Sequence, residues 1–195
     1  MDDHPATDSE LMHEVAAGNA QALAVVFGRY KNAIFNFCLR ILRNRSDAED
    51  VTSEVFMTLC TARYVQREGV KFSTWLFTIA RNNCVSKIRG QRKFFSMWVK
   101  DQETGEQEHL EIPDKKHGAD IKLQEKETMS QINQAIHALP FEQKEAIILR
   151  EFQQMNYEEI AAVLNCSIAK VKILIFRARE SLRAQLPALL EEGLS

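Results

Sequence analysis

Hydrophobic residues recur every three or four positions over two long stretches of this chain, with a polar segment between them. Apolar side chains at that spacing line one face of an α-helix, which turns by about 100° per residue. The first stretch covers residues 8–95, with a continuous run of such positions from Leu23 to Leu42, and the second covers residues 127–190. The 195 residues include only 7 glycines and 4 prolines, too few for the many tight turns of an all-β fold. The pattern predicts an all-α protein with two small helical domains.

Residues 96–126 lose the helical periodicity. Every residue from Asp101 to Glu108 is polar or glycine, and Pro113 and Gly118 follow. Such a segment has too little apolar surface to bury a core of its own. We therefore expect a flexible acidic linker that joins the two domains.

Local start signals divide the first domain into helices. Ser46, followed three positions later by Glu49, fits a capping box, in which two side chains satisfy the free amides at a helix start. Asp47 and Asp50 add negative charge near the positive end of that helix dipole. Another helix is expected to begin near Phe72.

The helix that begins near Phe72 mixes aromatic and basic residues. Its expected buried stripe consists of Phe72, Trp75, Leu76, Ile79 and Ala80. Phe77 lies off this stripe, as does Arg81, which makes Phe77 the better candidate for stacking on an unpaired base. Phe72 and Trp75 are more simply explained as core residues.

Basic residues are segregated in the same part of the chain. From Lys71 to Lys100 there are seven basic side chains and no acidic one, although the whole chain carries 25 basic and 27 acidic residues. A basic patch in an acidic protein indicates contact with a polyanion, and aromatics and amides among the cations suit single-stranded nucleic acid. A solvated helix face is the alternative, but such faces usually mix both signs of charge.

The second domain contains the pattern of a helix-turn-helix, in which two helices are joined by a turn of three or four residues. Pro140 suits the first position of a preceding helix. Asn156 and Glu159 form a capping box that opens a short helix. Asn165 can adopt the left-handed conformation that ends this helix, and Ser167 can cap the next one.

The last helix of this motif has two different faces. The stripe expected to pack inward consists of Ile168, Val171, Leu174, Ile175, Ala178 and Leu182. The opposite face carries Lys170, Lys172, Ile173, Phe176 and Arg177. Its cations could meet phosphates or guanine edges, and its apolar side chains could touch thymine methyl groups. A plain amphipathic helix with solvated lysines is the alternative, but it leaves two apolar residues among the cations unexplained.

Composition and missing motifs exclude several other classes of protein. No apolar run approaches the roughly 20 residues that span a bilayer, and the acidic start of the chain is unlike a secretory signal. The four cysteines lack the spacing of a zinc site or a disulfide framework, so we expect them to be reduced and buried. No phosphate-binding glycine loop, dinucleotide fingerprint or nucleophile–base arrangement is present. We expect a cytoplasmic protein that is not an enzyme and has no cofactor, metal or small-molecule substrate.

Two blocks of the sequence resemble conserved regions of bacterial RNA polymerase sigma factors. The block that resembles the second conserved region comprises residues 46–51, 54–56 and 72–82. The block that resembles the fourth region comprises residues 139–151, 157–161, 171–172 and 177–179. The short build, with only a linker between the blocks, is similar to the extracytoplasmic-function group of the sigma-70 family.

The resemblance implies that the protein binds core RNA polymerase, directs it to promoters and helps to open the minus-ten element. The residues implied in binding core polymerase are Asp47, Glu49, Asp50 and Glu54. Those implied at the minus-ten element, read as a single strand, are Arg63, Lys71, Phe72, Trp75, Phe77, Thr78, Arg81, Asn82, Lys87 and Arg89. Those implied at the double-stranded minus-thirty-five element are Ser167, Lys170, Lys172, Ile173, Phe176, Arg177 and Arg179. An anti-sigma factor is a further partner that the resemblance implies, although no residue identifies it.

The chain departs from the family pattern in its last helix. Ile173-Leu174 stands where many members have a polar pair, and Ala169-Lys170 stands where Gly-Thr is common. The family's preference for an upstream DNA sequence therefore does not transfer to this chain. Neither the target promoters nor the inducing signal follows from the sequence.

One other class of DNA-binding protein would also contain a helix-turn-helix. A repressor or activator that acts without being a polymerase subunit would explain residues 139–183. It would leave the acidic helix and the basic segment of the first domain without a role. A symmetric operator footprint obtained without polymerase would favour it.

Overall fold

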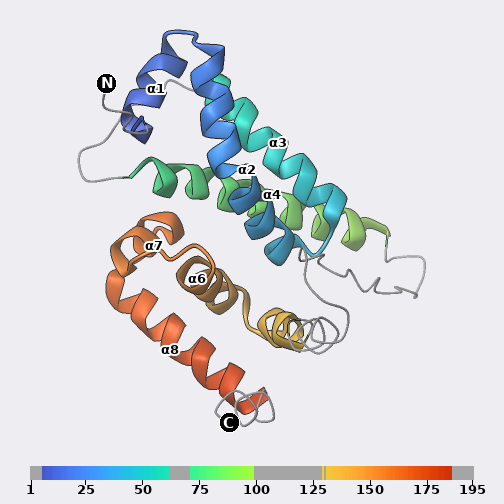
Figure 1. Cartoon of the computed structure of the whole chain (residues 1–195). Helices are drawn as coiled ribbons and strands as arrows, with labels where there is room; N and C mark the ends of the chain where they lie inside the picture. The colour runs from blue at the N-terminus through green and yellow to red at the C-terminus, as the bar shows by residue number, and fades with distance from the viewer. Residues whose placement is uncertain (1–5, 62–70, 99–128, 130, 186–195) are drawn as a thin grey trace, which may run out of the picture. The chain divides into compact units, whose positions relative to one another are not determined.

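The computed structural model describes residues 6–61, 71–98, 129 and 131–185. All regular secondary structure in these residues is helical, which confirms the predicted all-α class (Figure 1). The chain divides into two units, Met1–Thr104 and Gly105–Ser195.

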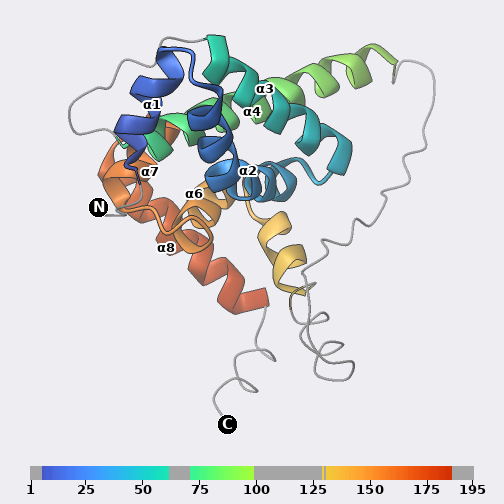
Figure 2. The ribbon, with the colours of Figure 1, turned by 45° about the horizontal axis from the view of Figure 1, so that its top comes forward.

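The first unit is built around the long helix α2 (Ala20–Leu42). It packs against α1 (Asp8–Ala16), α3 (Arg45–Thr61) and α4 (Phe72–Trp98). Figures 1 and 2 both show α2 and α3 side by side, with α4 crossing them. The core consists of fully buried side chains from these helices, among them Val26, Ile34, Phe37, Val51, Val55, Leu59 and Leu76.

The helix α3 begins two residues earlier than the capping-box prediction requires, at Arg45. The side chain of Asn44 accepts a hydrogen bond from the backbone amide of Asp47 at 2.9 Å, so Asn44 is the capping residue. Ser46 therefore lies inside the helix, and the prediction that it is the cap was wrong. Glu49 instead pairs with Arg45, one helical turn before it, at 2.9 Å. Asparagine caps helices as well as serine does, so the spacing of Ser46 and Glu49 does not by itself locate the cap.

The second unit comprises a helical segment at residues 131–138 and three further helices. These are α6 (Phe141–Glu151), α7 (Tyr157–Leu164) and α8 (Ile168–Gln185). The helix α6 packs against both α7 and α8, and α7 packs against α8. The core includes Ile147, Ile148, Leu149, Ile160, Val171 and Ile175.

The predicted turn signals of the helix-turn-helix are confirmed. The side chain of Asn156 accepts from the amide of Glu159 at 2.8 Å, and the Glu159 carboxylate accepts from the amide of Asn156 at 2.8 Å. Asn165 ends α7 in the left-handed conformation, with φ 51°. The hydroxyl of Ser167 accepts from the amide of Lys170 at 3.2 Å. Pro140 occupies the position just before α6, not its first turn.

Asn156→Ala is expected to lower the free energy of unfolding of the second unit by about 1 kcal/mol, the usual cost of losing a side-chain cap. Far-UV circular dichroism during urea unfolding would measure it. Asn156→Asp is the matched control, because aspartate accepts the same hydrogen bond. An equal loss in both variants would contradict a capping role.

The first domain ends later in the chain than predicted. The helix α4 continues to Trp98, past the expected end of the first domain at residue 95. The rest of the predicted linker, with its acidic run, lies outside the described residues. Of the four cysteines expected to be reduced and buried, Cys38 and Cys84 are buried free thiols and Cys166 is half-buried. The side chain of Cys60 lies outside the described residues.

Within the described ranges, none of the helices is both long and apolar enough to cross a membrane. The same residues contain no cluster of three or more His, Cys, Asp or Glu side chains that could hold a metal ion.

Candidate nucleic-acid interfaces

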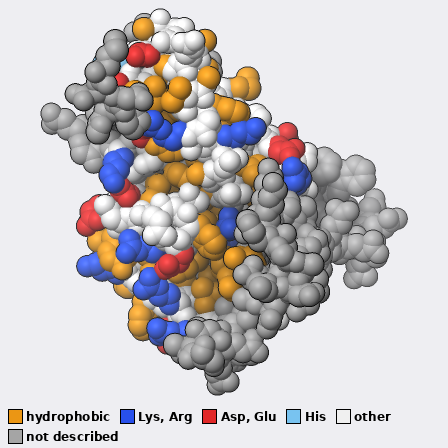
Figure 3. Space-filling model, in the orientation of Figure 1, with side chains coloured by type: hydrophobic (Ala, Val, Ile, Leu, Met, Phe, Trp, Pro, Cys, Tyr) orange, Lys and Arg blue, Asp and Glu red, His pale blue; other side chains and the backbone are white. Residues whose placement is uncertain are grey.

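The helix α8 presents the predicted mixed face to solvent. Lys170, Lys172 and Arg177 are exposed, and the apolar side chains between them, Ile173 and Phe176, are 51% and 65% exposed. Lys and Arg side chains lie beside hydrophobic ones over α8 (Figure 3). Large apolar side chains at this exposure gain nothing from the protein's own core, so the face is suited to a contact outside the chain.

The inward stripe of α8 is confirmed except at its two ends, and at the far end Leu182 is half-buried. Val171, Leu174, Ile175 and Ala178 are buried. Ile168 was expected to pack inward, but it is exposed. It is the first residue of the helix, and a terminal turn has neighbours on fewer sides than a middle one.

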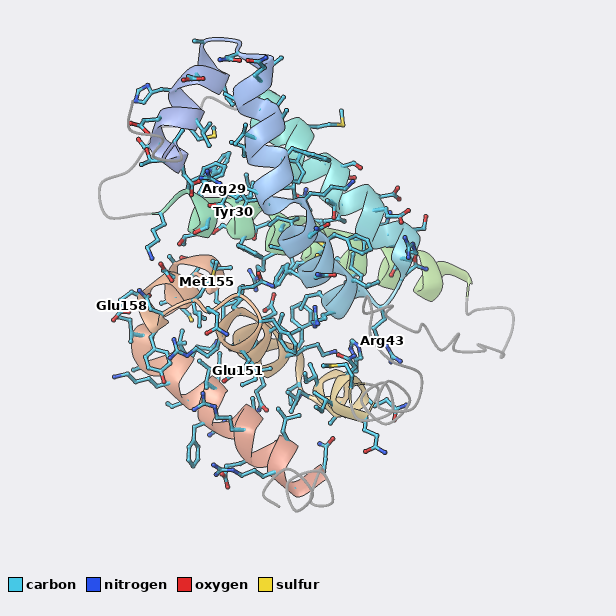
Figure 4. The ribbon with its side chains drawn as sticks, in the orientation of Figure 1. Arg29, Tyr30, Arg43, Glu151, Met155 and Glu158 are labelled. Carbon is cyan, nitrogen blue, oxygen red and sulfur yellow. The ribbon has the colours of Figure 1, made fainter. Side chains whose placement is uncertain are left out.

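Two of the predicted DNA-binding cations of α8 are paired inside the unit. Lys170 lies 2.7 Å from Glu142, and Arg179 lies 2.8 Å from Glu151, both of α6. Glu151 is labelled in Figure 4. The hydrogen bond to Glu142 raises the pKa of Lys170 above its ordinary value. These pairs join α8 to α6, so each of the two cations already has a carboxylate partner within the unit.

The other two cations of the face have different surroundings. Lys172 lies over the ring of Tyr157, with its Nζ 5.9 Å from the ring centroid. The guanidinium of Arg150 also approaches this ring, at 5.1 Å, and donates to the backbone carbonyl of Met155 at 2.8 Å. Arg177 has no carboxylate partner among the residues that the structure describes. Arg177 is therefore the cation of α8 most available to a nucleic acid.

In the first unit, the basic residue Lys87 of α4 lies against acidic residues of α3. Lys87 of α4 reaches the first half of α3, where its Nζ lies 3.1 Å from Asp47 and 3.2 Å from Asp50. Hydrogen bonds to Asp47 and then Asp50 raise the pKa of Lys87. Gln91, one turn further along α4, donates to Asp47 at 2.7 Å. Two of the four predicted polymerase-binding acids and a predicted DNA-binding cation thus belong to a single cluster.

The four acidic residues of α3 that were predicted to bind polymerase differ in their exposure to solvent. The side chain of Asp47 is only 16% exposed, whereas that of Asp50 is 58% exposed. Glu49 and Glu54 are also exposed. Asp47 therefore serves mainly to hold α4 against α3, and the carboxylates open to a partner are the other three. The part played by Gln91 was missed, because residue spacing within one helix does not reveal what the neighbouring helix presents.

The aromatic residues of α4 are placed differently from the prediction. Phe77, expected off the buried stripe, is only 3% exposed and packs edge-on against Phe37, with ring centroids 5.5 Å apart. Trp75, expected in the core, is half-buried. The helix α4 contacts both α2 and α3, so its buried arc is rotated to include Phe77 and Cys84. Phe77 is a core residue in this fold, and Trp75 is the more accessible ring.

The other residues predicted at the minus-ten element fall into three groups. Asn82 and Arg89 are exposed on one side of α4, seven positions apart, and Thr78 lies one turn before Asn82. Lys71 is exposed and Arg81 is half-buried, while Phe72 is buried. Arg63 lies outside the described residues.

Comparison with known proteins accounts for both units. Residues 26–94 match the model of sigma-70 region 2, and residues 129–182 match that of sigma-70 region 4. SigW of Bacillus subtilis, an ECF RNA polymerase sigma factor, is 32% identical over 182 residues, which cover 89% of this chain and 93% of SigW. The chain belongs to the extracytoplasmic-function group of sigma-70 factors.

Other curated relatives agree with this assignment. The RNA polymerase sigma-H factor of Pseudomonas aeruginosa is 31% identical, covering 95% of this chain and 97% of the relative. The ECF sigma-E factor of Escherichia coli is 30% identical, covering 90% and 92%. A sigma factor is a non-catalytic subunit of RNA polymerase, so the prediction that the chain is not an enzyme agrees with its family.

Solved structures of similar proteins share the fold. The sigma factor RpoE from Bartonella quintana, solved with the anti-sigma factor NepR, has a TM-score of 0.68 at 24% identity and covers 85% of this sigma factor and 96% of its own chain. CnrH, solved with the cytosolic domain of CnrY, has a TM-score of 0.65 at 22% identity, with coverage of 91% and 96%. The alternative of an independent helix-turn-helix regulator does not account for the region 2 match.

Proposed function

We propose that this sigma factor directs core RNA polymerase to its promoters through three surfaces: α8 for the minus-thirty-five element, α4 for the minus-ten element, and α3 for the polymerase. The observation that carries the proposal is the exposed face of α8. Two large apolar side chains, Ile173 and Phe176, stand there between exposed cations in the second helix of a well-capped helix-turn-helix. The second helix of this motif enters the major groove of DNA.

On α8, the side chains divide by the kind of contact they favour. Arg177 offers a guanidinium that suits the two acceptors of guanine. Ile173 and Phe176 offer apolar surface for thymine methyl groups. Lys172, and Lys170 once released from Glu142, suit phosphates, which fix position without reading sequence. Ser167 caps the helix through its hydroxyl, which places the start of α8.

On α4, we place the contact with the non-template strand along the side that carries Thr78, Asn82 and Arg89. Amide and hydroxyl groups can read unpaired base edges, and arginine follows the backbone. Trp75 is half-buried, whereas Phe72 and Phe77 are buried, so we assign the contact with a base to Trp75 among these three rings. The proposal also includes Lys71 and Arg81, and it includes Arg63, which lies outside the described residues.

Arg89→Ala is expected to reduce the salt slope of binding to a single-stranded minus-ten oligonucleotide by about 0.7, the contribution of one phosphate contact. Lys87→Ala is expected to reduce the slope by less, because Asp47 and Asp50 already neutralise this ammonium group. Holoenzyme affinity measured over a series of salt concentrations gives both slopes. Equal changes would mean that Lys87 leaves its carboxylates when DNA binds.

On α3, the proposed contact with core polymerase uses Glu49, Asp50 and Glu54, which are exposed along the helix. Asp47 contributes through its bond to Lys87 more than through direct contact. A row of carboxylates favours a basic surface on the partner. By analogy with the complex of RpoE with the anti-sigma factor NepR, an anti-sigma factor is a further proposed partner. A sigma factor acts where the polymerase is, so we place the protein in the cytoplasm.

Reconstitution with core RNA polymerase on fragmented genomic DNA tests the proposal. The 5′ ends of the transcripts are sequenced and compared with those made by core enzyme alone. Discrete start sites that share two spaced upstream motifs are expected. Ends identical to those of core enzyme alone would refute it.

A further inference from the structure

One carboxylate at the start of α1 holds two neighbouring side chains of α2. The two oxygens of Asp8 accept hydrogen bonds from different donors, Oδ1 from the guanidinium of Arg29 and Oδ2 from the hydroxyl of Tyr30. Arg29 also donates to the backbone carbonyl of Ala6 at 3.0 Å. Figure 4 shows Arg29 and Tyr30 between α1 and the beginning of α4. The first turn of α1 is thereby fixed to the middle of α2.

The ring of Tyr30 continues this contact to α4. It packs edge-on against the ring of Phe72, with centroids 5.4 Å apart and planes at 72°. Phe72 is the first residue of α4, and its ring lies 5.8 Å from that of Trp75. A continuous chain of contacts therefore leads from Asp8 through two buried or half-buried rings to Trp75.

The start of α4 depends on such support. Its first turn contains no acidic residue, so no side chain there complements the positive end of the helix dipole. The backbone bond that opens the helix, from the amide of Trp75 to the carbonyl of Lys71, is 3.3 Å long. The contact of Tyr30 with Phe72 is therefore one of the contacts that can set the direction of this turn.

We propose that Tyr30, oriented by Asp8, is a positioning residue for the first turn of α4 and so for capture of the non-template strand by Trp75 and the side chains beyond it. The inference rests on the proposed role of α4 at the minus-ten element. Burial, followed by the bond to Asp8, raises the pKa of Tyr30, so its hydroxyl stays a donor at neutral pH. The ring of Tyr30 packs against Phe72, and the hydrogen bond from its hydroxyl to Asp8 fixes the orientation of the ring.

The test uses holoenzyme reconstituted with the full-length chain and a fluorescent single-stranded minus-ten oligonucleotide. Tyr30→Leu removes the ring and is expected to weaken binding by about twofold to tenfold, the equivalent of one lost edge-on ring pair. Tyr30→Phe and Asp8→Ala each remove the hydroxyl bond and are expected to have a smaller effect. The double variant is expected to be no weaker than the weaker single variant, because both changes remove the same bond. Phe35→Leu, on the same helix but packed near Arg45, is the matched control and should bind as the unchanged chain does.

Two further readings separate positioning from general instability. Each variant is titrated with core polymerase to count active molecules, and its affinity for minus-thirty-five duplex DNA is measured in holoenzyme. Both are expected to stay unchanged. Unchanged oligonucleotide affinity in Tyr30→Leu would overturn the inference, and so would a loss matched by an equal loss of duplex affinity among the active molecules. If Tyr30→Leu does not fold, the Tyr30→Phe and Asp8→Ala pair still decides, since additive effects would overturn it. Failure of the unchanged holoenzyme to prefer the minus-ten strand would instead refute the proposed function of α4.

Discussion

Replacing Phe77 with alanine is expected to lower the free energy of unfolding of the first unit by about 3–5 kcal/mol, as for other buried phenylalanines. The ring is almost fully buried and packs against the fully buried ring of Phe37, so its loss leaves a cavity between α2 and α4. Both tryptophans of the chain, Trp75 and Trp98, lie in α4. Tryptophan fluorescence during urea unfolding therefore reports the stability of this unit.

Phe27→Ala provides a control for the deletion of a ring. Phe27 is partly exposed on α2, where its ring packs against Phe56 with centroids 4.7 Å apart. Removal of a partly exposed ring is expected to cost less than removal of a buried one. If Phe77→Ala unfolded like the unchanged chain but lost affinity for single-stranded DNA, the base-stacking role first expected for Phe77 would be correct.

The second large effect is expected for Arg177→Ala, which should weaken binding to the minus-thirty-five element by about 5-fold to 150-fold, the range for one lost arginine–guanine contact. The loss should depend on the base that Arg177 reads, and it should shrink on DNA that carries a different base there. Binding of the holoenzyme to a set of duplexes with single base changes measures both quantities.

Arg179→Ala is the matched control, two residues along the same helix. Its guanidinium pairs with Glu151, and this hydrogen bond raises the pKa of Arg179 above its ordinary value. An exposed pair of this kind contributes little to stability. We expect a small loss that is equal on all duplexes. A base-dependent loss for Arg179→Ala, with a uniform loss for Arg177→Ala, would exchange their proposed roles.

The parts of the fold that sequence predicts well are those governed by neighbours along the chain. Asn156, Glu159, Asn165 and Ser167 act on backbone groups within a few positions of themselves, and all four do so as predicted. The prediction for Ser46 failed for a related reason. Asn44 offers an equally good acceptor two residues earlier, and the backbone selects only one cap.

The parts that sequence did not predict depend on how helices face one another. A helical wheel gives the angle between Phe77 and Trp75, but it does not say which side of α4 meets α2 and α3. The pairs of Lys87 with Asp47 and of Lys170 with Glu142 likewise join helices far apart in sequence. Residue type alone identified these lysines as candidate DNA-binding residues. Only the packing of the helices shows that each lysine already pairs with a carboxylate of the same chain.

The position of Lys87 between α3 and α4 has a consequence for how the two partners of the first unit affect each other. A phosphate that draws this ammonium group away leaves Asp50 with its full negative charge, which favours a basic partner. Conversely, a basic group of the partner that pairs with Asp50 removes one carboxylate from Lys87, and the ammonium group can then bind a phosphate more readily. Thermodynamic linkage requires each ligand to change the affinity for the other by the same factor. The transcript yield of a Lys87 variant would therefore depend on two changed affinities, one for polymerase and one for single-stranded DNA. Titrating each ligand separately is needed to measure the two changes individually.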